Sequence, residues 1–252
     1  MAVTRAADGA LAGARVLITG ASSGIGAATA TAMAARGARL VLTGRDREAL
    51  EAVAARTGGR VLLADLRTDV DDLAERAGQI DVLVGNAGEG WCGPLAEMPA
   101  GAVERLVAVN LTAPIRLTRA LLPGMTARGR GHLVYVASIA GAVGVREEAV
   151  YSATKAGLLA FAESLRYEVS GVHVTVVLPG VVDTPFFERR GRPYGRSRPA
   201  PLPAERVARA IVGAVERGRA ETFVPGWLRL PARLAGAAPG PFRVLARRFG
   251  RP

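Results

Sequence analysis

The chain has 252 residues, half of them hydrophobic, and its 33 Lys and Arg side chains exceed its 22 Asp and Glu to give a formal net charge of +11. This length fits one α/β domain, and the hydrophobic content excludes a disordered basic tail. The sequence has neither the roughly 18 uncharged apolar residues that span a bilayer nor the apolar core of a signal peptide, so we expect a cytoplasmic protein.

Short apolar runs rich in Val and Leu alternate with longer segments of helical period. The runs predict seven strands, at residues 14–19, 38–44, 59–64, 81–85, 131–138, 172–178 and 221–225. The longer segments predict helices near residues 24–36, 46–56, 69–77, 97–122, 151–169 and 204–218. This alternation predicts an α/β fold of the Rossmann type, with a doubly wound, seven-stranded parallel sheet and helices on both faces, in a single domain over residues 1–225.

The first strand runs directly into the Gly-rich sequence TGASSGIG at residues 19–26 and then into a helix. This arrangement favours binding of a dinucleotide pyrophosphate, because free N–H groups and the positive end of the helix dipole face the anion. Gly20 permits the tight turn, Gly24 allows close approach of the backbone, and Gly26 lets the helix pack on the sheet. Ordinary turn glycines are the alternative. The predicted contacts are Gly20, Ser22, Ser23, Gly24, Ile25 and Gly26.

The end of the second strand bears on the choice between NADP(H) and NAD(H). An acidic side chain there accepts the ribose hydroxyls of NAD, whereas an arginine attracts the 2′-phosphate of NADP. The strand ends in Gly44 and Arg45, which favours NADP(H). Two alternatives stay open: a shift of one residue would place Asp46 at the ribose, and Arg45 can belong to a solvated turn.

Further motifs follow along the chain: Asp65 after the third strand, Asn86-Ala87-Gly88 after the fourth, then Asn110, Ser138, Tyr151 with Lys155, and Pro179-Gly180 followed by Thr184. Together with TGASSGIG they resemble the roughly 250-residue branch of the short-chain dehydrogenase/reductase family, over nearly the whole chain to about residue 225. Gly85 departs mildly from the family, which usually has a second Asn there. The resemblance implies further cofactor contacts from Asp65, Leu66, Asn86, Ala87, Gly88, Tyr151, Lys155, Pro179, Gly180, Val182 and Thr184.

Tyr151 and Lys155 are four residues apart in a predicted helix, so both side chains lie on one face. A nearby ammonium stabilises a phenolate and lowers the pKa of the tyrosine from about 10. Lys155 is the only lysine among 33 basic residues, which suggests a site that Arg cannot fill, with chance survival as the alternative.

The resemblance also implies a role for each catalytic residue. Tyr151 is the expected general acid/base, and Lys155 is expected to bind the nicotinamide ribose as well. Ser138 is expected to bond the substrate oxygen, and Asn110 to hold a water that relays protons from Lys155. A helix irregularity before Pro114 is the alternative reading of Asn110.

Loops that follow the strands are expected to shape the substrate pocket, at residues 89–95, 140–149 and 185–203, the last being a predicted lid rich in Arg and Pro. Their composition predicts an apolar pocket with a charged rim. Arg146 or a lid arginine can pair with a substrate carboxylate, with solvated loop charges as the alternative.

The positive charge lies near the C-terminus, because residues 189–252 carry 15 basic and 3 acidic side chains, against 18 and 19 before them. Residues 226–252 form a basic tail containing Pro and Gly. Four apolar side chains in it can share one face of a short helix: Phe242, Val244, Leu245 and Phe249. A peripheral contact with an anionic membrane, packing on a sister subunit or on the pocket mouth, and a mobile extension stay open. No reading motif accompanies the charge, so nucleic-acid binding is not predicted.

The sequence thus predicts an NADP(H)-dependent oxidoreductase that interconverts a ketone or aldehyde and an alcohol by direct hydride transfer. A homodimer or homotetramer is expected as well. The alternative is a non-catalytic NADP-binding redox sensor, which is expected to lack Ser138, Tyr151 or Lys155. No metal site is predicted, since Cys92 is the only cysteine.

Overall fold

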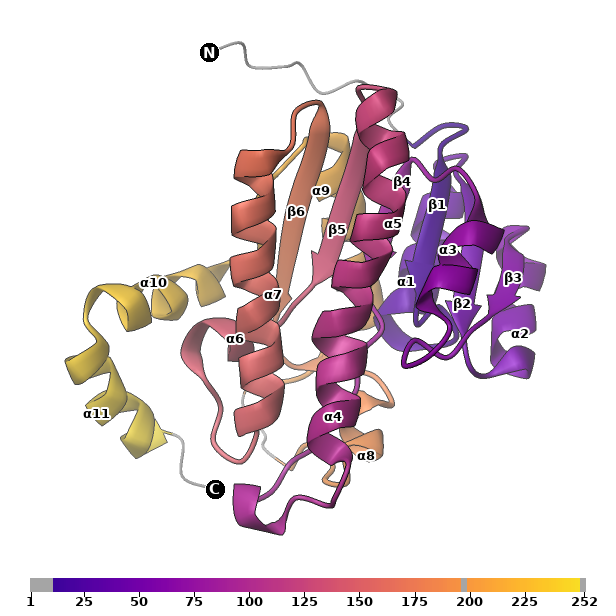
Figure 1. The fold of residues 1–252 in the computed structure, drawn as a ribbon. Coiled ribbons are helices and arrows are strands. Elements are labelled where there is room, and N and C mark those ends of the chain that lie inside the picture. Colours follow the sequence, from indigo (N-terminus) through magenta and orange to yellow (C-terminus); the bar gives the residue numbers. More distant parts are fainter. Residues whose placement is uncertain (1–10, 196–198, 250–252) are drawn as a thin grey trace.

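The computed structural model describes residues 11–195 and 199–249, and side chains in all of these except 245–249. Seven strands form one parallel sheet in the order β3-β2-β1-β4-β5-β6-β9, which confirms the predicted fold class (Figure 1). Their bounds are β1 Arg15–Thr19, β2 Arg39–Gly44, β3 Arg60–Leu63, β4 Val82–Gly85, β5 Gly131–Val136, β6 Val172–Pro179 and β9 Glu221–Val224.

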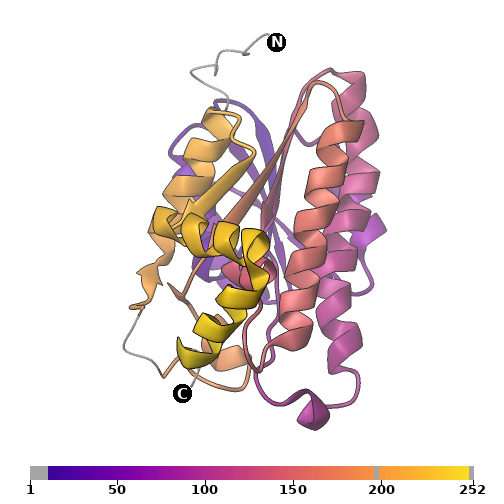
Figure 2. The same ribbon diagram turned by 90° about the vertical axis from the view of Figure 1, so that its left-hand side faces the viewer.

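Helices cover both faces of the sheet, as Figure 2 shows edge-on. Successive side chains of a strand point to opposite faces, so Leu17 of β1 packs in one core, whereas Val16 and Ile18 pack in the other. This explains why the strands are apolar at nearly every position. One face is covered by α1 (Gly24–Ala34), α2 (Arg47–Thr57) and α9 (Ala204–Glu216), and the other by α3 (Val70–Ala77), α5 (Ala113–Ala127) and α7 (Ala149–Glu168).

The single helix predicted over residues 97–122 is wrong in both bounds and in regularity. Residues Leu95–Glu97 form a short 3-10 turn (η1), and Gly101 adopts a positive φ of 73° before α4 (Ala102–Val107). A π-helical turn, η2 (Ala108–Thr112), then joins α4 to α5. α5 continues past Pro123 to residue 127, because its last turn is anchored by the fully buried Met125.

Several short elements were not predicted. α6 (Ile139–Val143) follows β5, which ends at residue 136 rather than 138. Within the predicted lid, β7 (Val182–Asp183) pairs with β8 (Leu202–Pro203), and α8 (Phe186–Arg189) lies between them. Residues 196–198 of the lid lie outside the described residues.

The basic tail folds into helices that stand beside the sheet (Figures 1 and 2). A 3-10 turn, η3 (Gly226–Leu228), leads into α10 (Arg229–Ala237), which is followed by α11 (Pro239–Phe249). The predicted shared face of α11 is not testable, because the side chains of Leu245 and Phe249 lie outside the described residues. No helix in the described part of the chain is both long and apolar enough to cross a membrane.

Candidate active site

The carboxyl ends of the parallel strands open into one cleft of about 1260 Å³. Because the predicted motifs follow successive strands, the fold brings them to the same edge of the sheet. Every predicted site residue lines this cleft except Gly26 and Asn110, which are buried beside it.

The Gly-rich turn forms the floor at one end of the cleft. Gly20 and Gly24 adopt positive φ angles of 64° and 53°. A Cβ on Gly26 would lie 2.1 Å from the carbonyl oxygen of Gly20, so no larger residue fits there. Gly26 therefore supports the turn rather than lining the cleft, in line with its predicted role in helix packing.

Asn86 ties this turn to the end of β4. Its Nδ2 donates to the carbonyl oxygens of Thr19 (2.9 Å) and Gly20 (3.2 Å). The Thr19 hydroxyl in return accepts from the backbone N–H groups of Asn86 and Ala87, each at 3.0 Å. Asn86 thus positions the Gly-rich turn in addition to lining the cleft.

The N-terminus of α1 suits an anion. Ser23 is the N-cap residue, yet its side chain makes no capping hydrogen bond, and the first turn contains no acidic residue. A Cβ on Gly24 would lie 2.9 Å from Cγ2 of Thr184, so the base of the lid sits directly against the turn. Free N–H groups at a helix N-terminus and a closely approaching backbone fit a dinucleotide pyrophosphate.

Arg45 and a residue that the sequence did not single out, Glu89, pair at the end of the cleft where the adenosine ribose of the cofactor is predicted. Nη2 of Arg45 lies 3.0 Å from Oε1 of Glu89, whose Oε2 lies 3.0 Å from Nε of Arg105. Asp46 instead caps α2 by accepting from the N–H of Ala49 at 3.0 Å. The Asp46 carboxylate is thereby engaged at the helix, and Arg45 extends with its side chain 57% exposed.

Asp65, at the same end, is paired with Arg67. Nε of Arg67 lies 2.9 Å and 3.0 Å from the two carboxylate oxygens of Asp65. The side-chain hydrogen bond from Arg67 holds the pKa of Asp65 below its usual value. At neutral pH, Asp65 therefore presents a carboxylate at this predicted cofactor contact.

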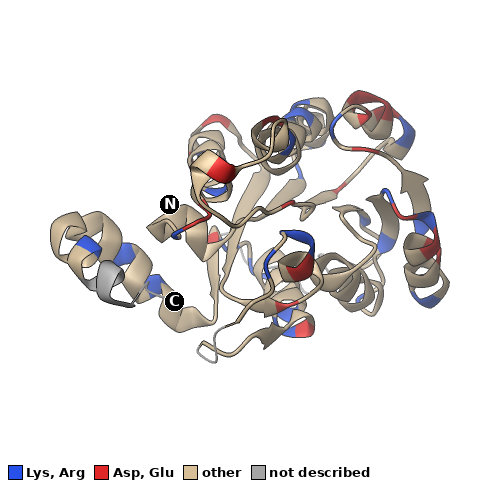
Figure 3. Cartoon of the chain, turned by 90° about the horizontal axis from the view of Figure 1, so that it is seen from below, with Lys and Arg blue, Asp and Glu red and all other residues tan. Residues whose placement is uncertain are grey.

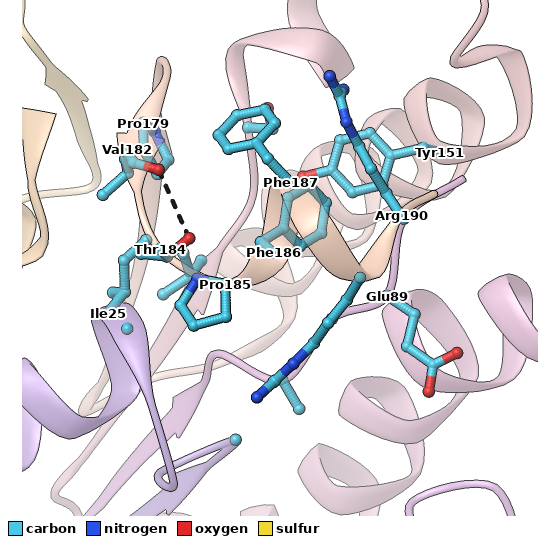
Figure 4. A pocket seen from close by; sticks show the side chains of 18 of the residues that line it. Ile25, Glu89, Tyr151, Pro179, Val182, Thr184, Pro185, Phe186, Phe187 and Arg190 are labelled. Atoms are coloured by element: carbon cyan, nitrogen blue, oxygen red, sulfur yellow. Dashed lines mark hydrogen bonds between the residues drawn. The ribbon is translucent and has the colours of Figure 1, made fainter. Parts of the chain in front are cut away.

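Tyr151 lies on α7 and is buried in the cleft wall, where Figure 4 shows it beyond Phe186 of α8. Burial raises the pKa of Tyr151, since a phenolate loses hydration there, while a hydrogen bond with Ser138 lowers it in part. Ser138 caps α6, where its Oγ accepts from the N–H of Ala140 at 3.1 Å. A protonated phenol and a hydroxyl therefore lie together.

Lys155 lies one helical turn after Tyr151, as its spacing predicts. Its Nζ donates to the carbonyl oxygen of Val136 at 2.9 Å and lies 5.7 Å from the centroid of the Tyr151 ring. Burial lowers the pKa of Lys155 to about 8, so the ammonium form still prevails at pH 7. Burial dominates the pKa of Tyr151 in this arrangement, and the predicted lowering by Lys155 stays a prediction.

Asn110 is at the centre of the π-helical turn η2. It is 1% exposed, and its Oδ1 accepts from the N–H of Glu89 at 2.8 Å. Its Nδ2 donates to the carbonyl oxygen of Glu89 (2.9 Å) and to Oγ1 of Thr154 (3.2 Å). A Cβ on Gly88 would lie 3.3 Å from Oδ1 of Asn110 and 3.5 Å from Nζ of Lys155. The helix irregularity therefore directs Asn110 toward the Lys155 region, and its relay role stays a prediction.

The lid covers the cleft above Tyr151. The Phe186 ring centroid lies 5.4 Å from that of Tyr151, and the Phe187 ring lies 4.5 Å below the guanidinium of Arg190 (Figure 4). Arg190 is buried and forms an ion pair with Glu148, at the start of α7.

The charges at the rim pair mostly with each other. Arg192 of the lid pairs with Glu147, which also lies 3.9 Å from the exposed Arg146. These contacts join the lid to the loop before α7.

Comparisons with known proteins agree with this geometry. Residues 14–194 match the family model for short-chain dehydrogenases. An uncharacterised oxidoreductase of Myxococcus xanthus is 37% identical over 247 residues, which cover 92% of this chain and 96% of that protein. A ketoacyl reductase of Nostoc, HetN, is 34% identical over 85% of this chain and 79% of its own length.

Solved structures show the same fold. A short-chain dehydrogenase from Sphingobium yanoikuyae in complex with NADPH is 33% identical, with a TM-score of 0.79 over 90% of this chain and 95% of its own. A short-chain dehydrogenase/reductase from Burkholderia phymatum in complex with NAD is 26% identical, with a TM-score of 0.81 over 90% of this chain and 94% of its own. The cleft and its motifs, the family match and these relatives lead to one conclusion: the chain is an oxidoreductase of the short-chain dehydrogenase/reductase family.

Proposed function

We propose that the protein is an NADP(H)-dependent oxidoreductase that interconverts a ketone or aldehyde and an alcohol by direct hydride transfer, with Tyr151 as general acid/base. The observation that carries the proposal is that Ser138, Tyr151 and Lys155 line one cleft with the Gly-rich turn, with Nζ of Lys155 5.7 Å from the centroid of the Tyr151 ring. When bound, the nicotinamide cofactor supplies or accepts the hydride.

The protein's own groups account for the proton. In the reducing direction, the hydroxyls of Tyr151 and Ser138 donate hydrogen bonds to the carbonyl oxygen, which polarises the carbonyl. Burial keeps Tyr151 protonated before reaction, so it donates its proton as negative charge develops on that oxygen. The Lys155 ammonium, one helical turn away, then stabilises the phenolate that remains.

The preference for NADP(H) is supported at the end of β2. Arg45 extends toward solvent beside the cleft, where it can meet a 2′-phosphate, and the competing carboxylate of Asp46 is engaged in capping α2. An arginine at this position attracts the additional phosphate of NADP.

Replacing Tyr151→Phe tests the mechanism. The variant keeps the ring that packs against Phe186 but lacks the proton donor. We expect it to bind NADPH as the wild type does, measured by nucleotide fluorescence, and to lose turnover in a screen of ketones, aldehydes and alcohols followed by NADPH absorbance. Undiminished turnover would refute the role of Tyr151. Binding without turnover in the wild type itself would favour the redox-sensor alternative, although Ser138, Tyr151 and Lys155 are all present.

Two further expectations stay predictions from the sequence. The homodimer or homotetramer is testable by light scattering of the purified protein. The cytoplasmic location is testable by fractionation of cells.

A further inference from the structure

The tail presents an apolar face to solvent. Trp227, Leu230 and Leu234 are 60%, 65% and 47% exposed, and Val244 of α11 is 72% exposed. Large apolar side chains that gather on one exposed surface mark a contact site rather than ordinary surface scatter. We call Trp227, Leu230 and Leu234 the tail surface; Val244 lies on the next helix, α11.

Helical spacing explains why this face points away from the body. Trp227, Leu230 and Leu234 follow at intervals of three and four, so they share one side of η3 and α10. Leu228 lies on another side and is buried against Gly180: a Cβ added to Gly180 would lie 2.9 Å from Cδ1 of Leu228. Leu228 therefore anchors the segment while the tail surface stays uncovered.

The charge of the tail selects the kind of partner. Residues 226–252 contain six arginines and no acidic residue. In the coloured ribbon of Figure 3, the charged positions along α10 and the described part of α11 are all basic. Arg233 pairs with Glu221 of β9. A twofold contact between two tails would therefore bring arginines against arginines, with no carboxylate from either tail to pair with them.

We propose that the tail surface docks on an anionic lipid bilayer. A helix with aromatic and aliphatic side chains on one side and arginines beside them lies in the bilayer interface, with the arginines at the lipid phosphates. Trp227 suits this position because its ring is mostly apolar and its indole N–H is polar. Long arginine side chains bury their stems in the interface and keep the guanidinium at the headgroups.

Vesicle sedimentation of the full chain tests the proposal. We expect binding to vesicles of phosphatidylglycerol and phosphatidylcholine, and at least tenfold weaker binding to phosphatidylcholine alone. The double variant Leu230→Ser, Leu234→Ser is expected to partition onto the anionic vesicles at least tenfold less than the wild type. Each of Arg229→Gln and Arg243→Gln is expected to reduce this partitioning about fivefold.

Matched controls separate this surface from general effects. Leu95→Ser removes another exposed leucine, 59% exposed on η1, and Arg206→Gln removes an exposed arginine of α9. Both are expected to bind the anionic vesicles as the wild type does. Absence of vesicle binding in the wild type would overturn the proposal. Equal losses of vesicle binding in the two controls would also overturn it. If instead the wild type forms a dimer that binds no vesicles, and the leucine double variant is a monomer, the surface would belong to a contact between two copies of the chain.

A second inference concerns Arg189, on the exposed side of α8. Its Nη1 lies 3.4 Å from Oγ of Ser23, at the N-terminus of α1. The neighbouring lid arginines Arg190 and Arg192 pair with Glu148 and Glu147. Arg189 forms no ion pair with any carboxylate of the described residues. An unpaired guanidinium thus lies beside a helix N-terminus that is itself positive.

We infer that Arg189 binds the pyrophosphate of the nicotinamide dinucleotide from the lid side. The inference rests on the proposed function. Ser23 is the N-cap residue of α1, where the pyrophosphate is predicted, whereas the predicted 2′-phosphate site is Arg45, beyond the end of β2. A guanidinium and free N–H groups that converge on one place suit a phosphate group.

Nucleotide titrations of Arg189→Gln and Arg192→Gln test this assignment, because both residues are lid arginines and only one faces the turn. Arg189→Gln is expected to weaken binding of NADPH and NADH alike, about tenfold. Arg192→Gln is expected to bind both within twofold of the wild type. Unchanged affinity in Arg189→Gln, or a loss confined to NADPH, would overturn the assignment while leaving the proposed function intact. A wild type that binds neither nucleotide would overturn both.

Discussion

In the NADP(H) complex that we propose, Glu89 would compete with the 2′-phosphate for Arg45, so replacing Glu89→Gln is expected to strengthen NADPH binding. Its carboxylate lies 3.0 Å from Arg45 and also pairs with Arg105. The amide removes the charge and nearly conserves the shape. Asn110 binds the backbone of residue 89 on both its N–H and its carbonyl, so the loop is expected to keep its conformation.

The exposure of the pair limits the size of the effect. The Arg45 side chain is 57% exposed, and ion pairs with exposed partners contribute about 0.2 to 1 kcal/mol. Freeing Arg45 from this pair corresponds to a gain of about 1.4-fold to fivefold in NADPH affinity. NADH has no 2′-phosphate, so its affinity is expected to change by less than twofold.

Fluorescence titration with both nucleotides measures this difference. Glu147→Gln is the matched control, because Glu147 also pairs with exposed arginines of the cleft rim but lies in the loop before α7. The control is expected to leave the ratio of the two affinities unchanged. The reasoning is refuted if Glu89→Gln weakens NADPH binding, or if it strengthens NADPH and NADH binding equally.

Three further predictions concern single residues. Arg45→Asp is expected to shift the preference of the steady-state kcat/KM from NADPH toward NADH, and no shift would mean that the ribose site is elsewhere. Burial lowers the pKa of Lys155 from 10.5 to about 8 in the folded protein. Between these pH values the unfolded chain binds more protons than the folded protein, so the free energy of unfolding rises as pH rises from about 8 to 10.5. Lys155→Met is therefore expected to raise the Tm relative to the wild type at pH 7, and this difference in Tm is expected to shrink toward pH 10.5. A difference in Tm that does not depend on pH would contradict this. Gly26→Ala places a Cβ 2.1 Å from the carbonyl of Gly20, so a loss of about 1 to 3 kcal/mol in unfolding free energy is expected by denaturant titration. Gly236→Ala, with open space around it, is its control and is expected to show no loss.

Local patterns determined the sheet and the central chemistry of this protein. Strands buried on both faces must be apolar at successive positions, and all seven were therefore visible in the sequence. A spacing of four residues places Tyr151 and Lys155 on one helix face in any regular helix. The Gly-rich turn between β1 and α1 needs glycine where φ is positive, as at Gly20 and Gly24.

Only the tertiary structure decided the contacts between residues far apart in the chain. Glu89 meets Arg45, and Arg189 of the lid reaches Ser23, because parallel strands bring their following loops to one edge of the sheet. The contact of Asn110, in the π-helical turn η2, with the backbone of Glu89, 21 residues earlier, is likewise a contact that the local sequence does not show. Such pairings leave no periodic signal, since their partners are set by the packing of the whole domain rather than by neighbours in sequence.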